Sequence, residues 1–334
     1  FALGKIPEVL IDEDFAQTVW DRYIKTAEKY NEPGRFTTII GYEWTSTENG
    51  NNLHRNVLYR DNGDLARQML PYTTTESFNP EDLWNWMEQY EIKTQGDVLA
   101  LAHNGNLSNG IMFPVEVNPA TGKPLGENYM KDRNKWEPLY EITQIKGDGE
   151  SHPFLSPNDE FADYEIWDKG NLGIQKLKSK EMLKTEYIRE ALKDGIKLEE
   201  QLGVNPFKYG IAGGTDTHMA LSSAEEDNYW GKFKIQEPSK DRWSELSSQN
   251  KQNPNITIKG WEYSANGTTA VWATSNSREA IWDGMKRKET YATTGPRISL
   301  RFFGGYDFTE EDLESPDMVK LCYEKGVPMG GDLV

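Results

Sequence analysis

Predicted helices alternate with short apolar strands along this chain, and no other feature of the sequence restricts the fold as strongly. The spacing of apolar residues predicts amphipathic helices at residues 12–30, 79–91 and 180–202. Between them, β-branched and apolar runs predict strands, including residues 36–44 and 97–102. Such alternation is typical of an α/β fold built on a mainly parallel sheet or barrel.

The histidines lie where predicted strands begin or end. All four are in polar segments rich in glycine or asparagine: His54, His103, His152 and His218. In barrels and open α/β sheets, functional residues gather at the carboxyl ends of the strands. Asp216 and His218 follow the strand predicted at residues 209–213, and they point to the same side because residues two apart on an extended chain do so. Glu43 closes its own predicted strand.

Imidazole and carboxylate groups gathered at one edge of a sheet predict a shared metal site, formed by the histidines with Glu43 and Asp216. Such ligands suit zinc, manganese or iron, and a carboxylate can bridge two ions. Ions of this kind generate a hydroxide near neutral pH and polarise a phosphoryl or carbonyl oxygen. The pattern therefore favours a metal-dependent hydrolase.

Asp148, Glu150 and His152 form a second polar group. This group supplies another metal ligand or a general acid, or it only hydrates a loop, and the sequence leaves these interpretations open. Arg55 and Lys146 lie beside expected ligands and are candidates for holding an anionic substrate.

Two other classes of function stay open. Glu43 with Glu141 or Glu150 would form the carboxylate pair of a metal-free glycosidase, and the 11 tryptophans suit stacking on sugars. A non-catalytic protein that binds sugar or peptide, with at most a structural metal, is the other. The sequence contains no Gly-x-Ser-x-Gly elbow and no phosphate-binding Gly-x-x-x-x-Gly-Lys motif. Its one cysteine, Cys322, has no histidine near it in sequence, which argues against a thiol nucleophile.

Acidic residues outnumber basic residues by 54 to 37, for a formal charge of −17. A nucleic-acid-binding protein needs a basic face, and no block of lysine and arginine here supplies one. No apolar run approaches the roughly 18 residues of a membrane span, so we expect no membrane insertion. A small anionic substrate stays compatible with the charge, because a bound metal ion reverses the local field.

Six motifs together resemble the DUF3604 family, and the resemblance covers essentially the whole chain. They are Gly41-Tyr-Glu-Trp-Thr-Ser46, Asn52-Leu-His-Arg-Asn56, Ala102-His-Asn-Gly-Asn-Leu-Ser-Asn109, Gln144-Ile-Lys-Gly-Asp-Gly-Glu-Ser-His-Pro153, Gly214-Thr-Asp-Thr-His218 and Tyr291-Ala-Thr-Thr-Gly-Pro-Arg297. That family is similar to the PHP (polymerase and histidinol phosphatase) superfamily of metal-dependent phosphoesterases and related hydrolases.

The resemblance implies a distorted (β/α)7 barrel with two or three ions of zinc, manganese or iron at its carboxyl face. It implies these metal ligands: Glu43, His54, His103, Asp216 and His218. His152 or Glu150 would act as the general acid beside Asp148, and Arg55 or Lys146 would hold the anion. Further substrate contacts are expected from three residues of the same motifs: Asn104, Asn106 and Arg297.

The PHP pattern opens with His-x-His on its first strand and Asp-His on its second, and neither occurs in this sequence. We therefore expect the chain to lack its first βα units, which would leave the barrel open on one side and the site without about half of its ligands. Residues 1–296 are the expected barrel, with a long insertion at about 220–266, and residues 297–334 are the expected start of a β-rich region. The expected substrate is a small anionic ester, and a periplasmic or exported location is favoured.

Overall fold

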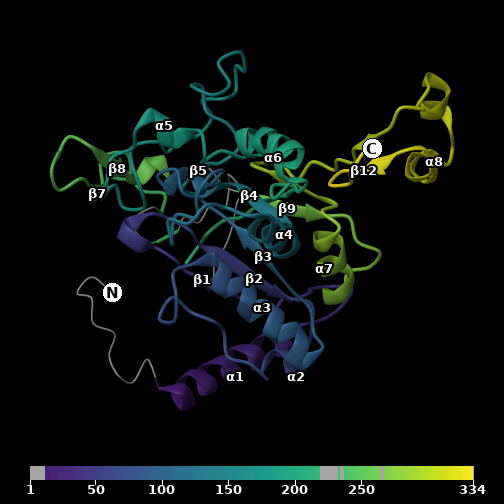
Figure 1. Cartoon of the computed structure of the whole chain (residues 1–334), viewed down its shortest axis with the longest axis horizontal. Helices are drawn as coiled ribbons and strands as arrows, with labels where there is room; N and C mark the ends of the chain where they lie inside the picture. Colours follow the sequence, from purple (N-terminus) through teal and green to yellow (C-terminus); the bar gives the residue numbers. More distant parts are fainter. Residues whose placement is uncertain (1–11, 219–231, 234–236, 264–266, 334) are drawn as a thin grey trace.

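The computed structural model describes residues 12–218, 232–233, 237–263 and 267–333. These residues form a mixed α/β structure around one six-stranded sheet (Figure 1). Its strands are β1 (Gly41–Trp44), β2 (Arg55–Tyr59), β3 (Val98–Ala102), β4 (Leu139–Gln144), β5 (Gly147–Asp148) and β6 (Gly210–Gly213). The α/β class expected from the sequence is confirmed.

The sheet combines antiparallel and parallel pairings. β1, β2 and β3 are antiparallel neighbours, whereas β4 pairs in parallel with β3 on one side and with β6 on the other. β5 pairs antiparallel with the end of β4. The expected parallel sheet is thus limited to β3, β4 and β6, because β1 returns into β2 without a crossover helix. The strands in the described ranges close no barrel, so the (β/α)7 barrel is not confirmed.

Both faces of the sheet are covered, which explains why β3 is buried along its whole length. Val98, Ala100 and Ala102 face the main hydrophobic core, whereas Leu99 and Leu101 face a smaller cluster on the other side. This alternation follows the two-residue period of a strand. The main core receives side chains from the helices α1, α3, α4 and α6, and the smaller cluster receives Trp282 of α7.

Side chains cap the N-termini of α1, α2, α3 and α7. Asp12 caps α1 by accepting the N–H of Phe15 at 2.8 Å, and Asn79 caps α3 directly before Pro80. No described helix is both long and apolar enough to span a membrane. The α-helices in the described ranges are α1 (Glu13–Tyr30), α2 (Gly63–Ala66), α3 (Pro80–Thr94), α4 (Glu127–Trp136), α5 (Lys180–Leu183), α6 (Ile188–Leu202), α7 (Arg278–Lys286) and α8 (Met318–Lys325).

The helix predicted over residues 180–202 is broken into α5 and α6. Between them, Thr185 donates its hydroxyl to the carbonyl of Gly110 at 2.7 Å and accepts the N–H of Phe113 at its own carbonyl. Glu186 accepts an ammonium proton of Lys178 at 2.5 Å. Because the Thr185 carbonyl accepts from Phe113 and not from the next helical turn, a tertiary contact overrides the local helical preference here.

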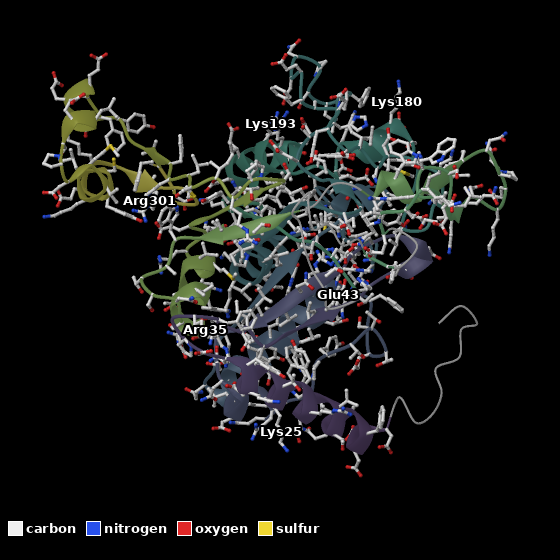
Figure 2. The ribbon with its side chains drawn as sticks, turned by 180° about the vertical axis from the view of Figure 1, so that it is seen from behind. Lys25, Arg35, Glu43, Lys180, Lys193 and Arg301 are labelled. Atoms are coloured by element: carbon white, nitrogen blue, oxygen red, sulfur yellow. The ribbon has the colours of Figure 1, made fainter. Side chains whose placement is uncertain are left out.

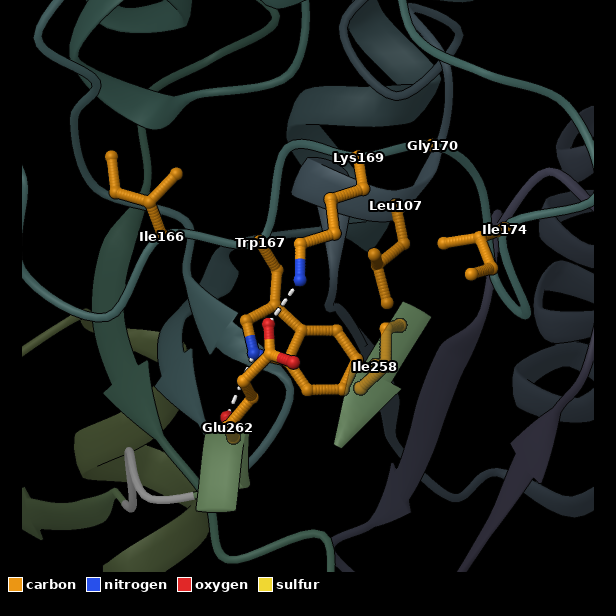
Figure 3. A pocket seen from close by; sticks show the side chains of 8 residues that line it. All are labelled: Leu107, Ile166, Trp167, Lys169, Gly170, Ile174, Ile258 and Glu262. Carbon is orange, nitrogen blue, oxygen red and sulfur yellow. Dashed lines mark hydrogen bonds and ion pairs between the residues drawn. The ribbon is translucent and has the colours of Figure 1, made fainter. Parts of the chain in front are cut away.

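A β-hairpin lies in the described part of the expected insertion, formed by β7 (Leu246–Gln249) and β8 (Thr257–Lys259). Figure 3 shows Ile258 of this hairpin beside Trp167, whose indole N–H donates to the carbonyl of Glu262 at 2.9 Å. The cavity here is about 10 Å³, roughly the space of one water molecule. It is therefore a packed contact between segments and not a substrate pocket. Residues 219–231 and 264–266 of the insertion lie outside the described residues.

The last part of the chain adds two further two-stranded antiparallel sheets. β9 (Thr268–Val271) pairs with β10 (Thr290–Thr293) and lies beside β6, where the Thr269 hydroxyl bonds both the N–H and the carbonyl of Gly213. β11 (Phe303–Gly304) pairs with β12 (Val327–Pro328). With α8 between them, these strands extend to one side of the molecule in Figure 1. The boundary expected near residue 296 stays a prediction.

Candidate metal centre

Glu43, His54 and His103 come together at one edge of the sheet. Glu43 lies on β1, His54 directly precedes β2 and His103 directly follows β3, so the antiparallel pairing brings all three to the same end. One oxygen of Glu43, Oε1, lies 2.8 Å from His54 Nδ1 and 2.9 Å from His103 Nε2. The three ligand atoms lie within 4.8 Å of one another. Figure 2 labels Glu43, whose side chain is 36% exposed, whereas His54 and His103 are buried.

The second nitrogen of each ring is also held. His54 Nε2 lies 2.6 Å from the Thr47 hydroxyl. His103 Nδ1 lies 3.3 Å from Asn104 Oδ1 and 3.7 Å from Glu141 Oε2. Metal-binding histidines usually have such a partner on the far nitrogen, because it fixes the orientation of the ring.

Charge at this centre suits a cation. Burial lowers the pKa of His54 to about 4, which favours the neutral imidazole that binds metal. Burial alone would raise the pKa of Glu43, but hydrogen bonds from His103 and His54 outweigh it and bring the pKa far below its ordinary value. Glu43 is therefore an anion held between the two imidazole rings.

Glu141 lies behind His103 and is almost fully buried. Its Oε2 has no hydrogen-bond partner among the described residues, and burial raises its pKa. Its Oε1 occupies the space that a Cβ on residue 214 would need, which explains the glycine at that position. Apart from the 3.7 Å approach of His103 Nδ1, this buried oxygen lacks a described hydrogen bond, which indicates a group that completes its contacts with a cation or a proton.

Asp216 and His218 lie at the end of β6 but do not join this group of three. Asp216 has a left-handed backbone with φ of 52°, and its Oδ2 accepts protons from Lys146 and, at 2.5 Å, from Lys232. His218 Nδ1 lies 2.9 Å from the carbonyl oxygen of Asp216, and its side chain is 45% exposed. Of the five expected ligands, only Glu43, His54 and His103 thus lie close together. The carboxylate of Asp216 is bound instead by Lys146 and Lys232.

The second polar group is held by its own partners. Glu150 forms an ion pair with Arg189 at 2.6 Å, and His152 Nε2 lies 3.2 Å from Asp168 Oδ2. Asp148 accepts the N–H of Glu150 at 3.0 Å. These contacts shape the loop after β5, and none of those described connects it with Glu43.

Arg55, expected to hold an anion, is buried in an ion-pair network under the sheet edge. Its Nε donates to Glu137 Oε1 at 2.9 Å, and its side chain is 1% exposed. Arg133 contacts the other carboxylate oxygen of Glu137 at 3.4 Å, and the Trp84 indole donates to the first at 3.0 Å. The structure gives Arg55 a structural partner and no access to a substrate.

The other residues expected to bind substrate lie in different surroundings. Lys146 faces Asp216 and is nine-tenths buried. Asn104 and Asn106 are buried and hold the loop after β4, where Asn106 donates to the carbonyl of Lys146 at 3.0 Å. Arg297 is exposed in the segment after β10.

Residues 5–334 match the family described as "Protein of unknown function (DUF3604)". The chain belongs to the DUF3604 family. Neither the curated proteins nor the solved structures contain a match to this DUF3604 chain. The expected similarity to the PHP superfamily is not among these findings.

Sequence reasoning missed two residues of this DUF3604 site. Lys232 reaches Asp216 from the irregular region after β6, where no periodic pattern marks it. The sequence indicated Glu141 only as half of a glycosidase pair, yet it lies on the largely buried strand β4. A carboxylate within a buried strand was the available signal, because such a group needs a partner.

We expect the stability of an Asp148→Asn variant, relative to the unaltered DUF3604 chain, to rise with pH. Burial raises the pKa of Asp148 from 3.8 to about 7, against the hydrogen bonds from two backbone N–H groups. A carboxyl group of this kind contributes stability that is fully present below its unfolded pKa and is lost as the pH rises through its folded pKa. Asparagine does not ionise. The free energy of unfolding of the variant minus that of the unaltered chain should therefore increase by about 2–3 kcal/mol between about pH 5 and pH 8.

Urea denaturation at the two pH values measures this difference and removes any constant cost of the substitution. A difference that is the same at both pH values would contradict the raised pKa of Asp148.

Proposed function

We propose that this chain binds a divalent metal ion at Glu43, His54 and His103 and hydrolyses phosphoesters or related esters of small anionic molecules. The observation that carries the proposal is the convergence of two imidazole nitrogens on one carboxylate oxygen, at 2.8 and 2.9 Å. Zinc, manganese and iron accept this donor set.

The donor set fits a metal ion in three respects. The ligand atoms are close enough to share one ion, since all lie within 4.8 Å. The far nitrogens of both rings are held by other groups. The carboxylates of Glu141 and Asp216 lie nearby, so the edge carries more negative groups than one ion needs. Two or three ions, as the PHP resemblance implies, are part of the proposal.

When bound, such an ion lowers the pKa of a coordinated water and polarises a phosphoryl or carbonyl oxygen. Thr47 and Asn104 hold the histidine rings in place, and Glu43 supplies the negative charge. Lys146 lies where an ammonium group would neutralise a negative substrate. The contacts of Glu150, His152 and Asp148 lend no support to a general-acid role for them, so the proposal leaves that role unassigned.

The similarity to the PHP superfamily also belongs to this proposal. β3, β4 and β6 form a parallel row, and His103, Lys146 and Asp216 follow their carboxyl ends. This is the edge where α/β folds place their functional residues. An open arrangement related to the PHP barrel is the fold that this pattern favours.

The experiment is elemental analysis of the purified chain after exposure to zinc, manganese and iron, followed by assays on p-nitrophenyl phosphate and its diester with and without a chelator. We expect at least one bound ion per chain and activity that the chelator removes and added metal restores. A chain that binds no ion would refute the proposal. Bound metal without turnover of any ester would favour the binding protein, and turnover of a glycoside in chelator would favour the glycosidase.

A further inference from the structure

Three buried side-chain amides lie behind His103 and are joined by hydrogen bonds around one residue of the backbone. Asn104 directly follows His103, Asn106 lies in the short 3₁₀ turn η3 (Gly105–Leu107), and Gln144 ends β4. Each of the three residues is at most 2% exposed, so its amide group has to find its partners inside the protein.

The backbone of Lys146 decides which way these amides face. Its N–H can only donate and lies 2.6 Å from Gln144 Oε1, so the nitrogen of Gln144 is left to donate to Asn104 Oδ1 at 2.5 Å. Its carbonyl can only accept and takes the nitrogen of Asn106 at 3.0 Å. The oxygen of Asn106 then accepts from Asn104 Nδ2 at 3.4 Å. Both routes turn the oxygen of Asn104 toward Gln144 and its nitrogen toward Asn106.

The orientation of Asn104 fixes a proton on His103. Asn104 Oδ1 lies 3.3 Å from His103 Nδ1, and because an amide oxygen only accepts, Nδ1 has to carry the proton of this bond. Glu141 Oε2 lies 3.7 Å from the same nitrogen, which is beyond hydrogen-bonding distance. The other nitrogen, Nε2, faces Glu43 Oε1 at 2.9 Å and is the one that can offer a lone pair to a cation.

The turn that carries Asn104 is held by the rest of the fold. Asn104 has a left-handed backbone with φ of 50°, a conformation that asparagine adopts more readily than most residues. The N–H of Gly105 donates to the Tyr140 hydroxyl at 3.0 Å, and a Cβ on Gly105 would lie 2.5 Å from that oxygen. The scaffold therefore positions the Asn104 amide without help from a bound group.

We infer that Gln144 and Asn106 are positioning residues, which fix the amide of Asn104, hold a proton on His103 Nδ1 and so direct Nε2 toward the candidate metal centre. The position of the proton depends only on these hydrogen bonds, whereas its use in binding a metal ion rests on the proposed function. The group that contacts the far nitrogen of a metal-binding imidazole decides which nitrogen carries the proton.

Nitrogen NMR of the histidine rings in the metal-free chain tests the position of the proton. The chain has four histidines, and comparison with the spectrum of His103→Ala identifies the signals of His103. We expect His103 Nδ1 to carry a proton both before and after zinc is added, and zinc to change the signal of Nε2. A His103 Nδ1 without a proton in the unaltered chain would overturn the inference.

Substitutions in the amide chain test its effect on metal binding, measured as the dissociation constant for zinc in competition with a chromophoric chelator. Gln144→Met keeps the length of the side chain but removes its bonds to Asn104 and Lys146, and we expect the constant to rise on the order of 10-fold. Asn104→Gly removes the amide itself and suits the left-handed backbone, so the rise should be on the order of 10- to 100-fold. Asn104→Asp keeps an acceptor oxygen beside His103 and should not weaken zinc binding.

Asn109→Gly is the matched control. Asn109 also has a left-handed backbone, with φ of 51°, and is 5% exposed, but its amide donates to the carbonyl of Lys176 at 3.1 Å. The same group is thus removed from the same backbone conformation, and zinc binding should not change. Equal effects of Asn104→Gly and Asn109→Gly, or unaltered zinc affinity in Gln144→Met, would overturn the inference.

The zinc content of the unaltered chain separates this inference from the proposed function. A protonated His103 Nδ1 in a chain that binds no zinc would support the proton position set by the amides and refute the proposed function. Bound zinc together with an unprotonated Nδ1 would refute the role of the amides and leave the proposed metal centre in place.

Discussion

Under the proposed function, the His103→Ala variant is expected to lose metal binding and ester hydrolysis together. His103 Nε2 is one of three ligand atoms around Glu43 Oε1, and alanine leaves only two. Loss of a partner outside the ligand shell costs roughly 10- to 100-fold in metal affinity, and loss of a ligand should cost more. We therefore expect at least a ~100-fold drop in zinc affinity and in hydrolysis of p-nitrophenyl phosphate. Elemental analysis and the rate assay measure the two effects.

His152→Ala is the matched control. Both histidines are buried, at 3% and 8% exposure, and both lie beside a carboxylate, Glu43 or Asp168. Truncation therefore removes the same ring from a similar setting outside the metal site. We expect His152→Ala to keep its metal content. Equal loss of metal in the two variants, or full retention in His103→Ala, would contradict the assigned site.

Glu137→Gln should be the most destabilising of the conservative changes considered, with a loss of about 3–5 kcal/mol in the free energy of unfolding. Glu137 is the shared counter-ion of Arg55 and Arg133, and all three side chains are at most 1% exposed. Their charges outweigh the effect of burial and lower the pKa of Glu137, so the carboxylate is ionised. Glutamine keeps the shape but leaves two buried guanidinium groups without an anion.

Urea denaturation measures this loss, provided that the free energy of unfolding of the variant depends on urea concentration with the same slope as that of the unaltered chain. Glu32→Gln is the comparison, because Glu32 pairs with Arg35 while both side chains are well exposed, at 61% and 80%. Exposed pairs of this kind contribute about 0–1 kcal/mol. A Glu137→Gln protein as stable as Glu32→Gln would show that the buried network does not need its carboxylate.

Much of the secondary structure follows from local sequence. The strand predicted at residues 97–102 is β3 (Val98–Ala102), and the helix predicted at residues 79–91 is α3 (Pro80–Thr94). Asn79 before Pro80 is a local signal, since the cap needs only the next few backbone N–H groups. The strand predicted at residues 36–44 is shorter, because Thr38 bonds back to Ala27 and Asn31 at the end of α1.

In the candidate site, too, some features follow from local sequence and others depend on contacts between distant residues. The sequence indicated Glu43, His54 and His103 as candidates, because each lies at an end of a predicted strand, but the antiparallel pairing that brings these ends together is seen only in the structure. The partners of Arg55 and Asp216 were not predictable, since Glu137 and Lys232 are 82 and 16 residues away in sequence. The residue type gives the charge of a side chain but not the charge of the group that the side chain contacts in the fold.

The sequence by itself determined the α/β class, the helix caps and the strand ends that carry the histidines, because these depend on periodicity and on neighbours within a few residues. Only the tertiary structure decided the direction of each strand, the break between α5 and α6, and the burial of Arg55 in an ion pair with Glu137. Those outcomes depend on contacts between distant segments, where desolvation and the charge of the partner decide the free energy.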